Sequence, residues 1–208
     1  MSEHSLDGAY SLKEPEDSVA YYRDWADEYD QQFAVAHGYA VPGQIAAIFR
    51  GEGGTGPVLD IGAGTGLVAQ ALSEGDPLEV DGIDISAEML RVAGEKGLYQ
   101  NRIVADLTKP LEIADAAYSG FVSAGTFTHG HVGPGCLPEL LRIASANALF
   151  VLAINEQIFD QEGFGSAFAR AVADGSISPV RFRKIRYYQD ADHEHAEDQG
   201  LVAVFRRI

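Results

Sequence analysis

Short apolar runs alternate along the chain with segments whose apolar residues recur at helical spacing. The runs are too short for helices, and their continuous apolar character is typical of strands buried on both faces of a parallel sheet. They predict strands at 58–61, 78–85, 100–105, 118–124 and 148–154, with two β-rich segments at 179–189 and 201–207. Helical spacing predicts helices in 16–36, 44–49, 67–72, 86–96, 138–146 and 164–172. The alternation predicts an α/β fold.

The turn after the first strand carries the densest chemical signal. Gly62, Gly64 and Gly66 stand at alternate positions, and Asp60 precedes the first of them by two residues. Glycines here let the backbone adopt positive φ and let a ligand approach without meeting a Cβ atom. A strand–turn–helix of this kind in an open α/β sheet faces the crevice where ligands bind. We therefore expect Asp60, Gly62, Ala63, Gly64 and Gly66 to hold a cofactor.

Two cofactor classes use such a turn. A dinucleotide-binding turn reads G-x-G-x-x-G and places helix amides against a pyrophosphate. Here the spacing is G-x-G-x-G, and the carboxylate of Asp60 would repel a pyrophosphate. It would suit the ammonium of S-adenosylmethionine (AdoMet), which carries no phosphate. A glycine turn that binds no ligand is the remaining alternative.

An acidic residue ends the second predicted strand. Asp84 follows Gly66 by 18 residues, and an acid at about this distance binds a ribose diol in Rossmann-type folds. Ser86 is the better helix cap, which leaves the Asp84 carboxylate for the ribose hydroxyls. Ile85 and Met89 would flank an adenine.

Composition and charge narrow the classes of function. The length of 208 residues suits one α/β domain, and the formal net charge of −16 disfavours nucleic acids and anionic membranes as partners. Cys136 is the only cysteine, which excludes an intramolecular disulfide and a cysteine-based zinc site. No signal peptide or membrane-length apolar run is evident, so we expect a cytoplasmic protein.

The N-terminal region is read in two ways. Tyr21, Trp25 and Tyr29 share one face of the helix predicted in 16–36, which is typical of an amphipathic helix packed on the core. Alternatively, Tyr21 and Tyr29 belong to a lid and approach the sulfonium as cation–π partners. We expect residues 1–15 to be disordered, residues 16–50 to form a helical lid, and residues 1–208 to form a single domain.

The segment from Asp60 to Gly66 resembles the first motif of the class I, Rossmann-like AdoMet-dependent methyltransferases. Tyr22–Asp30 is similar to the opening of many small-molecule methyltransferases, and with 64–68 and 126–132 it resembles the methyltransferase-like proteins of the Williams–Beuren region. This resemblance implies a seven-stranded, mostly parallel sheet with an antiparallel C-terminal hairpin strand and helices on both faces. It also implies methyl transfer to a small molecule, with S-adenosylhomocysteine (AdoHcy) as the product. The alternatives are an AdoMet-binding protein without transferase activity and an NAD-dependent oxidoreductase.

The resemblance assigns further residues to the site. It implies that Asp106 accepts from the adenine amino group, that the amide of Leu107 donates to the ring, and that Ala124 lies at the pocket. His129 and His131, in the loop after the fourth strand, would contact or deprotonate the acceptor, because a near-neutral pKa suits proton removal. Alternatively, they bond to the backbone of a polar loop; as metal ligands two histidines are a weak signal, and we expect no metal.

One turn departs from the family pattern. Before the fifth strand the family often has Pro-Gly-Gly, whereas this chain has Ser145-Ala-Asn-Ala148. The departure bears on the local shape of the turn more than on chemistry. We expect a small-molecule acceptor as partner, no nucleic acid, no membrane, and a monomer or homodimer.

Overall fold

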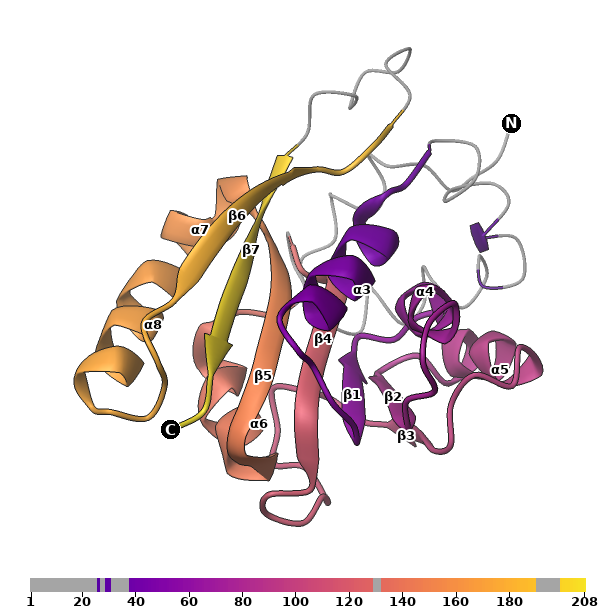
Figure 1. The fold of residues 1–208 in the computed structure, drawn as a ribbon, viewed down its shortest axis with the longest axis horizontal. Coiled ribbons are helices and arrows are strands. Elements are labelled where there is room, and N and C mark those ends of the chain that lie inside the picture. The colour runs from indigo at the N-terminus through magenta and orange to yellow at the C-terminus, as the bar shows by residue number, and fades with distance from the viewer. Residues whose placement is uncertain (1–25, 27–28, 31–37, 129–131, 190–198) are drawn as a thin grey trace.

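Seven strands form one sheet in the order β3-β2-β1-β4-β5-β7-β6 (Figure 1). The computed structural model describes residues 26, 29–30, 38–128, 132–189 and 199–208. The strands are β1 (Val58–Ile61), β2 (Val80–Asp84), β3 (Arg102–Val104), β4 (Tyr118–Phe127), β5 (Ala144–Asn155), β6 (Arg181–Arg186) and β7 (Gln199–Arg206). The first five pair in parallel, and β7 lies antiparallel between β5 and β6. The predicted fold class is confirmed.

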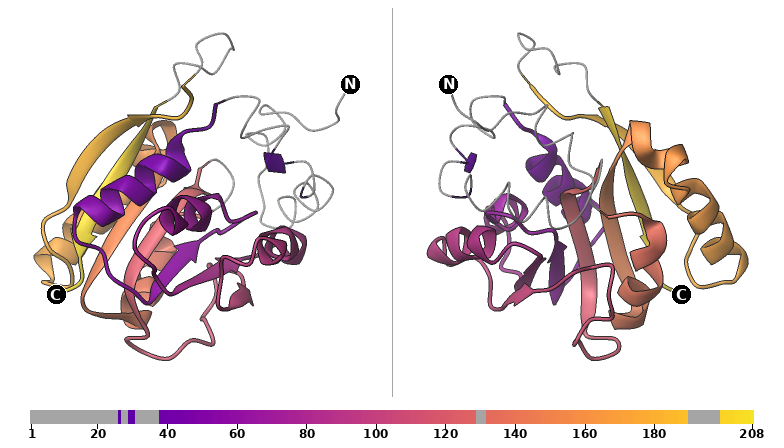
Figure 2. Two further views of the ribbon diagram at one scale, coloured as in Figure 1. Left: turned by 45° about the vertical axis from the view of Figure 1, so that its right-hand side comes forward. Right: turned by 180° about the vertical axis from the view of Figure 1, so that it is seen from behind.

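Helices cover both faces of this sheet (Figure 2). On one face α3 (Val41–Gly51) and α4 (Leu67–Ser73) pack over the centre, while α5 (Ala87–Glu95) contacts β2 and β3. The opposite face carries α6 (Leu137–Ile143), which follows the 3-10 turn η2 (Pro134–Cys136), and then α7 (Glu156–Gln161) and α8 (Phe164–Ala173). The inner strands β1, β4, β5 and β7 are therefore buried on both sides, which explains their apolar runs, whereas the edge strands β3 and β6 are largely exposed.

A stack of aromatic rings ties the sheet to its second helical layer. Phe121, Phe150 and Phe205 lie on the adjacent strands β4, β5 and β7. The ring centroids of Phe121 and Phe150 are 4.2 Å apart, and those of Phe150 and Phe205 are 4.7 Å apart. Phe168 of α8 meets Phe205 edge-on at 5.5 Å. Such pairs stabilise a core by about 0.5–1.5 kcal/mol each beyond the area they bury.

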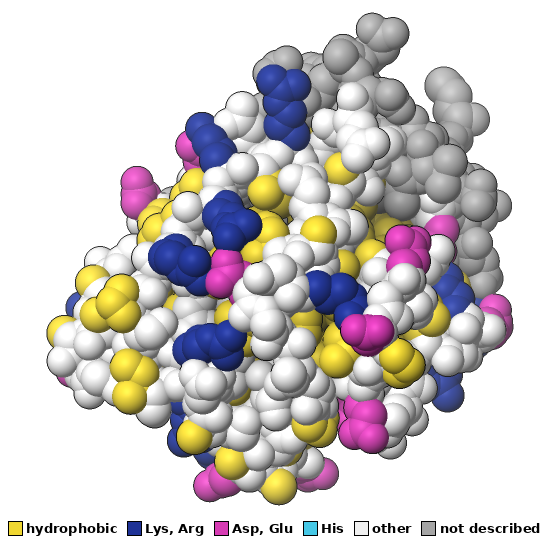
Figure 3. All heavy atoms as spheres, in the orientation of Figure 1, with side chains coloured by type: hydrophobic (Ala, Val, Ile, Leu, Met, Phe, Trp, Pro, Cys, Tyr) yellow, Lys and Arg dark blue, Asp and Glu magenta, His cyan; other side chains and the backbone are white. Residues whose placement is uncertain are grey.

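Basic side chains gather on the face formed by α3 and β6 (Figure 3). Arg181 and Arg183 each bind the Glu52 carboxylate at 2.5 Å, and Arg206 donates to the Glu52 carbonyl at 2.8 Å. The hydrogen bond from Arg181 is the main cause that holds the pKa of Glu52 below its usual range. This network fastens the end of α3 to the outer strands of the sheet.

Two helix boundaries differ from the prediction. The helix expected at 44–49 begins at Val41, because Pro42 occupies the first turn, where its missing N–H is not needed. The helix expected at 138–146 ends at Ile143, and Ala144 already pairs with Tyr118 of β4.

Further differences lie at strand ends near the crevice. β4 was expected to end at Ala124 but continues to Phe127, with an irregular register after Ser123. The short helix α7 was not predicted. The Asn155 side chain accepts from the Gln157 amide at 2.8 Å and so caps α7.

Several N-terminal predictions fall outside the described residues. The disorder expected for residues 1–15 and most of the helical lid expected at 16–50 concern residues that the structure does not describe, and the single-domain assignment stays a prediction. Within the described ranges, no helix is both long and apolar enough to span a membrane.

Candidate cofactor site

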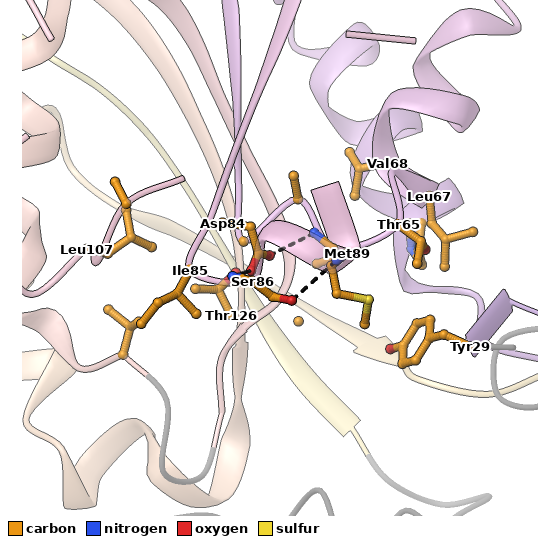
Figure 4. Close-up of a pocket in the computed structure, with 18 of the residues that line it drawn as sticks. Tyr29, Thr65, Leu67, Val68, Asp84, Ile85, Ser86, Met89, Leu107 and Thr126 are labelled. Atoms are coloured by element: carbon orange, nitrogen blue, oxygen red, sulfur yellow. Dashed lines mark hydrogen bonds between the residues drawn. The ribbon is translucent and has the colours of Figure 1, made fainter. Parts of the chain in front are cut away.

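A pocket opens where the direction of strand order changes, at the carboxyl ends of β1 and β4. Chain connections run from β1 outward to β2 and β3, and then back across to β4 and β5, which leaves a crevice between the two halves. The described lining comes from four strand ends, from α4 and α5, and from the N-terminal segment (Figure 4). It comprises Tyr29, Tyr39, Pro42, 62–65, Leu67, Val68, 84–86, Met89, 105–108, 124–126 and Val132.

The glycine-rich turn forms the floor of this pocket. Gly62, Gly64 and Gly66 have φ values of +63°, +52° and +89°, a region that side chains with a Cβ rarely adopt. A Cβ on Gly62 would lie 1.8 Å from Oγ1 of Thr126, and that hydroxyl donates to the Ile61 carbonyl at 2.6 Å. Gly64 has open space where its Cβ would be, so a ligand can lie directly on the backbone there.

Asp84 faces the pocket while its carboxylate organises the turn. Oδ2 accepts from the Gly64 amide and Oδ1 from the Ser86 amide, both at 2.8 Å. Burial raises the pKa of Asp84, and the amides of Ser86, Gly64 and Ile85 oppose that rise. Each carboxylate oxygen has a second lone pair, so Asp84 can still accept from a ligand hydroxyl.

Asp60 lies under this floor and does not line the pocket. It is fully buried, and Oδ2 accepts from the Tyr99 hydroxyl at 2.6 Å. Its Oδ1 has no hydrogen-bond partner among the described residues. Burial raises the pKa of Asp60 to about 7, against the Tyr99 hydrogen bond, which lowers it, while the charge of Asp84 adds to the rise.

Asp106 and Leu107 line the far end of the pocket. Oδ1 of Asp106 accepts from the Thr108 amide at 2.9 Å and from its hydroxyl at 2.6 Å, and Oδ2 pairs with Lys109 at 2.9 Å. Burial alone would raise the pKa of Asp106, but the hydrogen bonds of Thr108 and Lys109 and the charge of Lys109 outweigh it, so the pKa lies below its usual value. The carboxylate is thus charged and held by its own turn, and its remaining lone pairs can accept from a ligand.

Apolar side chains make up much of the remaining wall. Tyr29 lies on the same side of the pocket as Met89 and Leu67, whereas Ile85 lies nearer Leu107 (Figure 4). Tyr39 closes another side by donating from its hydroxyl to the Ala124 carbonyl at 3.0 Å.

Most of the predicted cofactor residues meet at this pocket. Those that line it are Tyr29, Gly62, Ala63, Gly64, Asp84, Ile85, Met89, Asp106, Leu107 and Ala124. Gly66 caps α4 just outside it, and Tyr21, His129 and His131 lie outside the described residues. Across the described ranges, no group of three or more His, Cys, Asp or Glu side chains could hold a metal ion.

The prediction missed Tyr39, Thr65, Tyr99 and Thr126. Their contacts join residues far apart in the chain, such as the 39 positions between Asp60 and Tyr99. The spacing of residues within a motif cannot predict contacts between segments that are this far apart in the chain. Thr126 did lie in the loop assigned to the acceptor, but its contact with the glycine turn depends on the pairing of β1 with β4.

Comparison with known proteins finds similarity to methyltransferases. Residues 58–146 match the family model described as a methyltransferase domain. The human methyltransferase-like protein 27 is 30% identical over 138 residues, which are 64% of this chain and 56% of that protein. The chain therefore spans just over half of the length of this curated relative.

Solved structures share the fold at low sequence identity. A SAM-dependent methyltransferase from Aquifex aeolicus superposes with a TM-score of 0.60, 18% identity, and coverage of 91% of this chain and 98% of that one. The 1,6-didemethyltoxoflavin-N1-methyltransferase of Burkholderia thailandensis, with bound 1,6-didemethyltoxoflavin and AdoHcy, gives 0.61 and 18%, covering 94% and 91%. Residues 58–146 thus resemble a methyltransferase domain, and the chain shares its fold with AdoMet-dependent methyltransferases of known structure.

Proposed function

We propose that this chain transfers the methyl group of AdoMet to a small molecule that is neutral or cationic. The observation that carries this proposal is the charge of the pocket wall. Among its described lining residues, the only charged side chains are Asp84 and Asp106, and most of the others are apolar or glycine. An anionic acceptor would find no cationic side chain in this described wall to compensate its desolvation, whereas an uncharged acceptor loses less on entry.

The cofactor fits the groups that the pocket presents. Asp84 would accept from the ribose hydroxyls, because its carboxylate is fixed by two amides and keeps acceptor capacity toward the pocket. Asp106 would accept from the adenine amino group and the Leu107 amide would donate to the ring. Ile85 and Met89 would cover the adenine faces. The open backbone at Gly64 would leave room for the amino-acid portion.

The chemistry makes modest demands on the protein. When bound, AdoMet supplies a methyl group on a positively charged sulfur, which a nucleophile displaces in line. The side chains of the pocket therefore act by excluding water and aligning the acceptor, which can contribute about 7–11 kcal/mol to lowering a barrier. We propose that His129 or His131 takes the acceptor proton where the nucleophile must lose one.

The pocket also bears on the size of the acceptor. Tyr39 closes the side near Ala124 and is held there by its hydrogen bond. The pocket is a crevice between strand ends rather than a long surface groove, which favours a small molecule over an extended polymer. A nitrogen, oxygen or carbon nucleophile remains compatible with this geometry.

An acceptor screen with methyl-deuterated AdoMet tests the proposal. The purified protein is incubated with pooled amines, phenols and heteroaromatic compounds, and with a matched pool of carboxylates and phosphate esters. Mass spectrometry then identifies labelled products. We expect label in the first pool only, and its loss in the Asp84→Ala variant. Label confined to the anionic pool would contradict the proposed acceptor class.

A further inference from the structure

A single carboxylate joins the N-terminal segment to two separate elements of the cofactor site. Oδ1 of Asp30 accepts from the Thr65 hydroxyl at 2.6 Å, and Oδ2 pairs with the Lys96 ammonium at 2.5 Å. Thr65 belongs to the glycine-rich turn, and Lys96 follows the last residue of α5. Asp30 therefore connects the chain before the sheet with the glycine-rich turn and with the C-terminal end of α5.

These contacts are sheltered from solvent. Thr65 is only 2% exposed, and the side chains of Asp30 and Lys96 are 26% and 22% exposed. By contrast, the Arg91–Glu95 pair on α5 has side-chain exposures of 49% and 66%. Exposed pairs contribute little to stability, whereas a sheltered charge that also accepts a hydroxyl hydrogen bond is costly to disrupt. The Asp30–Lys96 pair is thus better suited than the Arg91–Glu95 pair to hold another segment in place.

The neighbouring residue explains what these contacts position. Tyr29 lines the pocket, and its ring lies on the side where Thr65, Leu67 and Met89 are found (Figure 4). Because Tyr29 and Asp30 are adjacent in the chain, fixing the Asp30 carboxylate restricts where the Tyr29 ring can lie. Thr65 itself lines the pocket, so one hydrogen bond links two parts of the wall.

We propose that Asp30 is a positioning residue for the cofactor: through Thr65 and Lys96 it holds Tyr29 against the pocket and so slows cofactor release. The inference rests on the proposed function, because it assumes that AdoMet occupies this pocket. It assigns no chemical step to Asp30, which acts only through Tyr29 and the glycine-rich turn.

Binding and release of AdoHcy test this assignment in matched variants. Kd is measured by calorimetry and the dissociation rate by stopped-flow displacement, for the wild type and for Asp30→Ala, Asp30→Asn and Tyr29→Leu. We expect Asp30→Ala to raise Kd about tenfold, mainly through faster dissociation, since it removes one sheltered ion pair and one hydrogen bond. Asp30→Asn keeps an acceptor for Thr65 but loses the charge, so its Kd and dissociation rate should lie between those of the wild type and those of Asp30→Ala.

Four further variants separate positioning of the cofactor from general stability. Thr65→Val should reproduce part of the loss and Thr65→Ser should restore it, because only the second keeps a hydroxyl. Glu95→Gln breaks the exposed pair on the same helix and should leave Kd and the dissociation rate unchanged. In the double variant Asp30→Ala with Tyr29→Leu, the loss should be smaller than the product of the two single losses, because both act on the same contact.

The outcomes are distinct. Wild-type Kd and dissociation rate in Asp30→Ala and Asp30→Asn, or fully multiplicative losses in the double variant, would overturn the assignment even though AdoHcy binds. A lower melting temperature with unchanged binding would likewise reduce Asp30 to a structural role. If the wild type itself binds no AdoHcy, the proposed function fails first and the inference fails with it.

Discussion

The Tyr99 hydroxyl donates a 2.6 Å hydrogen bond to Oδ2 of Asp60, a fully buried carboxylate in the strand that leads into the glycine-rich turn. The Tyr99 ring also supports that region, because a Cβ on Gly82 would lie 2.9 Å from its Cε2 atom. Burial dominates the electrostatics of Asp60 and raises its pKa to about 7. The acid that precedes the glycine-rich turn thus has a pKa close to neutral pH.

This raised pKa predicts how stability depends on pH. Between the unfolded value of 3.8 and the folded value of about 7, the folded state binds more protons at Asp60 than the unfolded state. The stability that protonated Asp60 contributes is therefore complete below pH 3.8 and is lost as pH rises through 7. We expect Asp60→Asn to remove a fall of about 2–3 kcal/mol in unfolding free energy between pH 5 and pH 8.

Urea titrations at pH 5, 6, 7 and 8 measure that difference directly. Asn keeps the shape of the side chain and an acceptor for the Tyr99 hydroxyl, and Asp84 is the same in both proteins, so the comparison isolates Asp60. Parallel curves for the wild type and the variant would contradict the assignment of the titration to Asp60.

The ion pair between Glu139 and Arg142 predicts the opposite dependence. Arg142 donates to both Glu139 oxygens, at 2.7 Å and 3.0 Å, and the Leu111 amide adds a third donor at 2.7 Å. Arg142 is the main cause that lowers the pKa of Glu139 to about 2. This stability is present above the unfolded value of 4.5 and is lost as pH falls through 2. Glu139→Gln should therefore shift the midpoint of acid unfolding, followed by circular dichroism, to higher pH; an unchanged midpoint would refute this.

The glycine turn predicts a steric requirement at Gly62. Alanine there would combine a backbone at φ +63° with a Cβ 1.8 Å from Oγ1 of Thr126. We expect Gly62→Ala to lower the unfolding free energy by roughly 2 kcal/mol or more and to weaken AdoHcy binding. In the Thr126→Ala background the contact with Oγ1 disappears, while the Cβ of residue 126 stays 2.9 Å from the new methyl group. The cost should therefore be smaller there but remain above the backbone strain of about 1 kcal/mol. Equal costs in both backgrounds would show that Thr126 does not set the requirement.

The proposed role of a histidine as acceptor base predicts a loss of kcat when that histidine is replaced. If His129 or His131 removes a proton from the acceptor, replacing the essential one by alanine should lower kcat by a factor of about 10²–10⁴. AdoHcy affinity should stay unchanged, and a basic buffer such as imidazole should restore part of the rate. Single and double alanine variants, assayed on the acceptor found in the screen, distinguish the two. Full activity of the double variant would remove both histidines from the mechanism.

The fold and the glycine-rich floor of the pocket could be predicted from local sequence motifs. The glycine turn and the acid at Asp84 depend on neighbours in sequence, so their spacing was informative. The Asn155 cap of α7 was also a local signal, an Asn followed by Glu156 in the first turn, but it was not used to predict that helix. The apparent end of β4 at Gly125 was misleading because the strand continues through an irregular register.

Contacts between segments far apart in the chain could not be predicted from local sequence motifs. Tyr39 reaches Ala124 across 85 positions, and Asp30 reaches Lys96 across 66. Neither follows from a period or a motif, because each joins a residue that precedes the first strand to one far along the chain. Asp60 was predicted to face the ligand, and only the packing of Tyr99 and α4 around it shows that it is buried instead.

Calorimetric titration with AdoHcy and, separately, with NADH tests the central claim most directly, with Asp84→Ala as the paired variant. The pocket predicts micromolar binding of AdoHcy to the wild type, no binding of NADH, and an affinity about 100-fold weaker in Asp84→Ala, because the ribose loses its charged acceptor. Binding of NADH alone, or unchanged AdoHcy affinity in Asp84→Ala, would contradict the account.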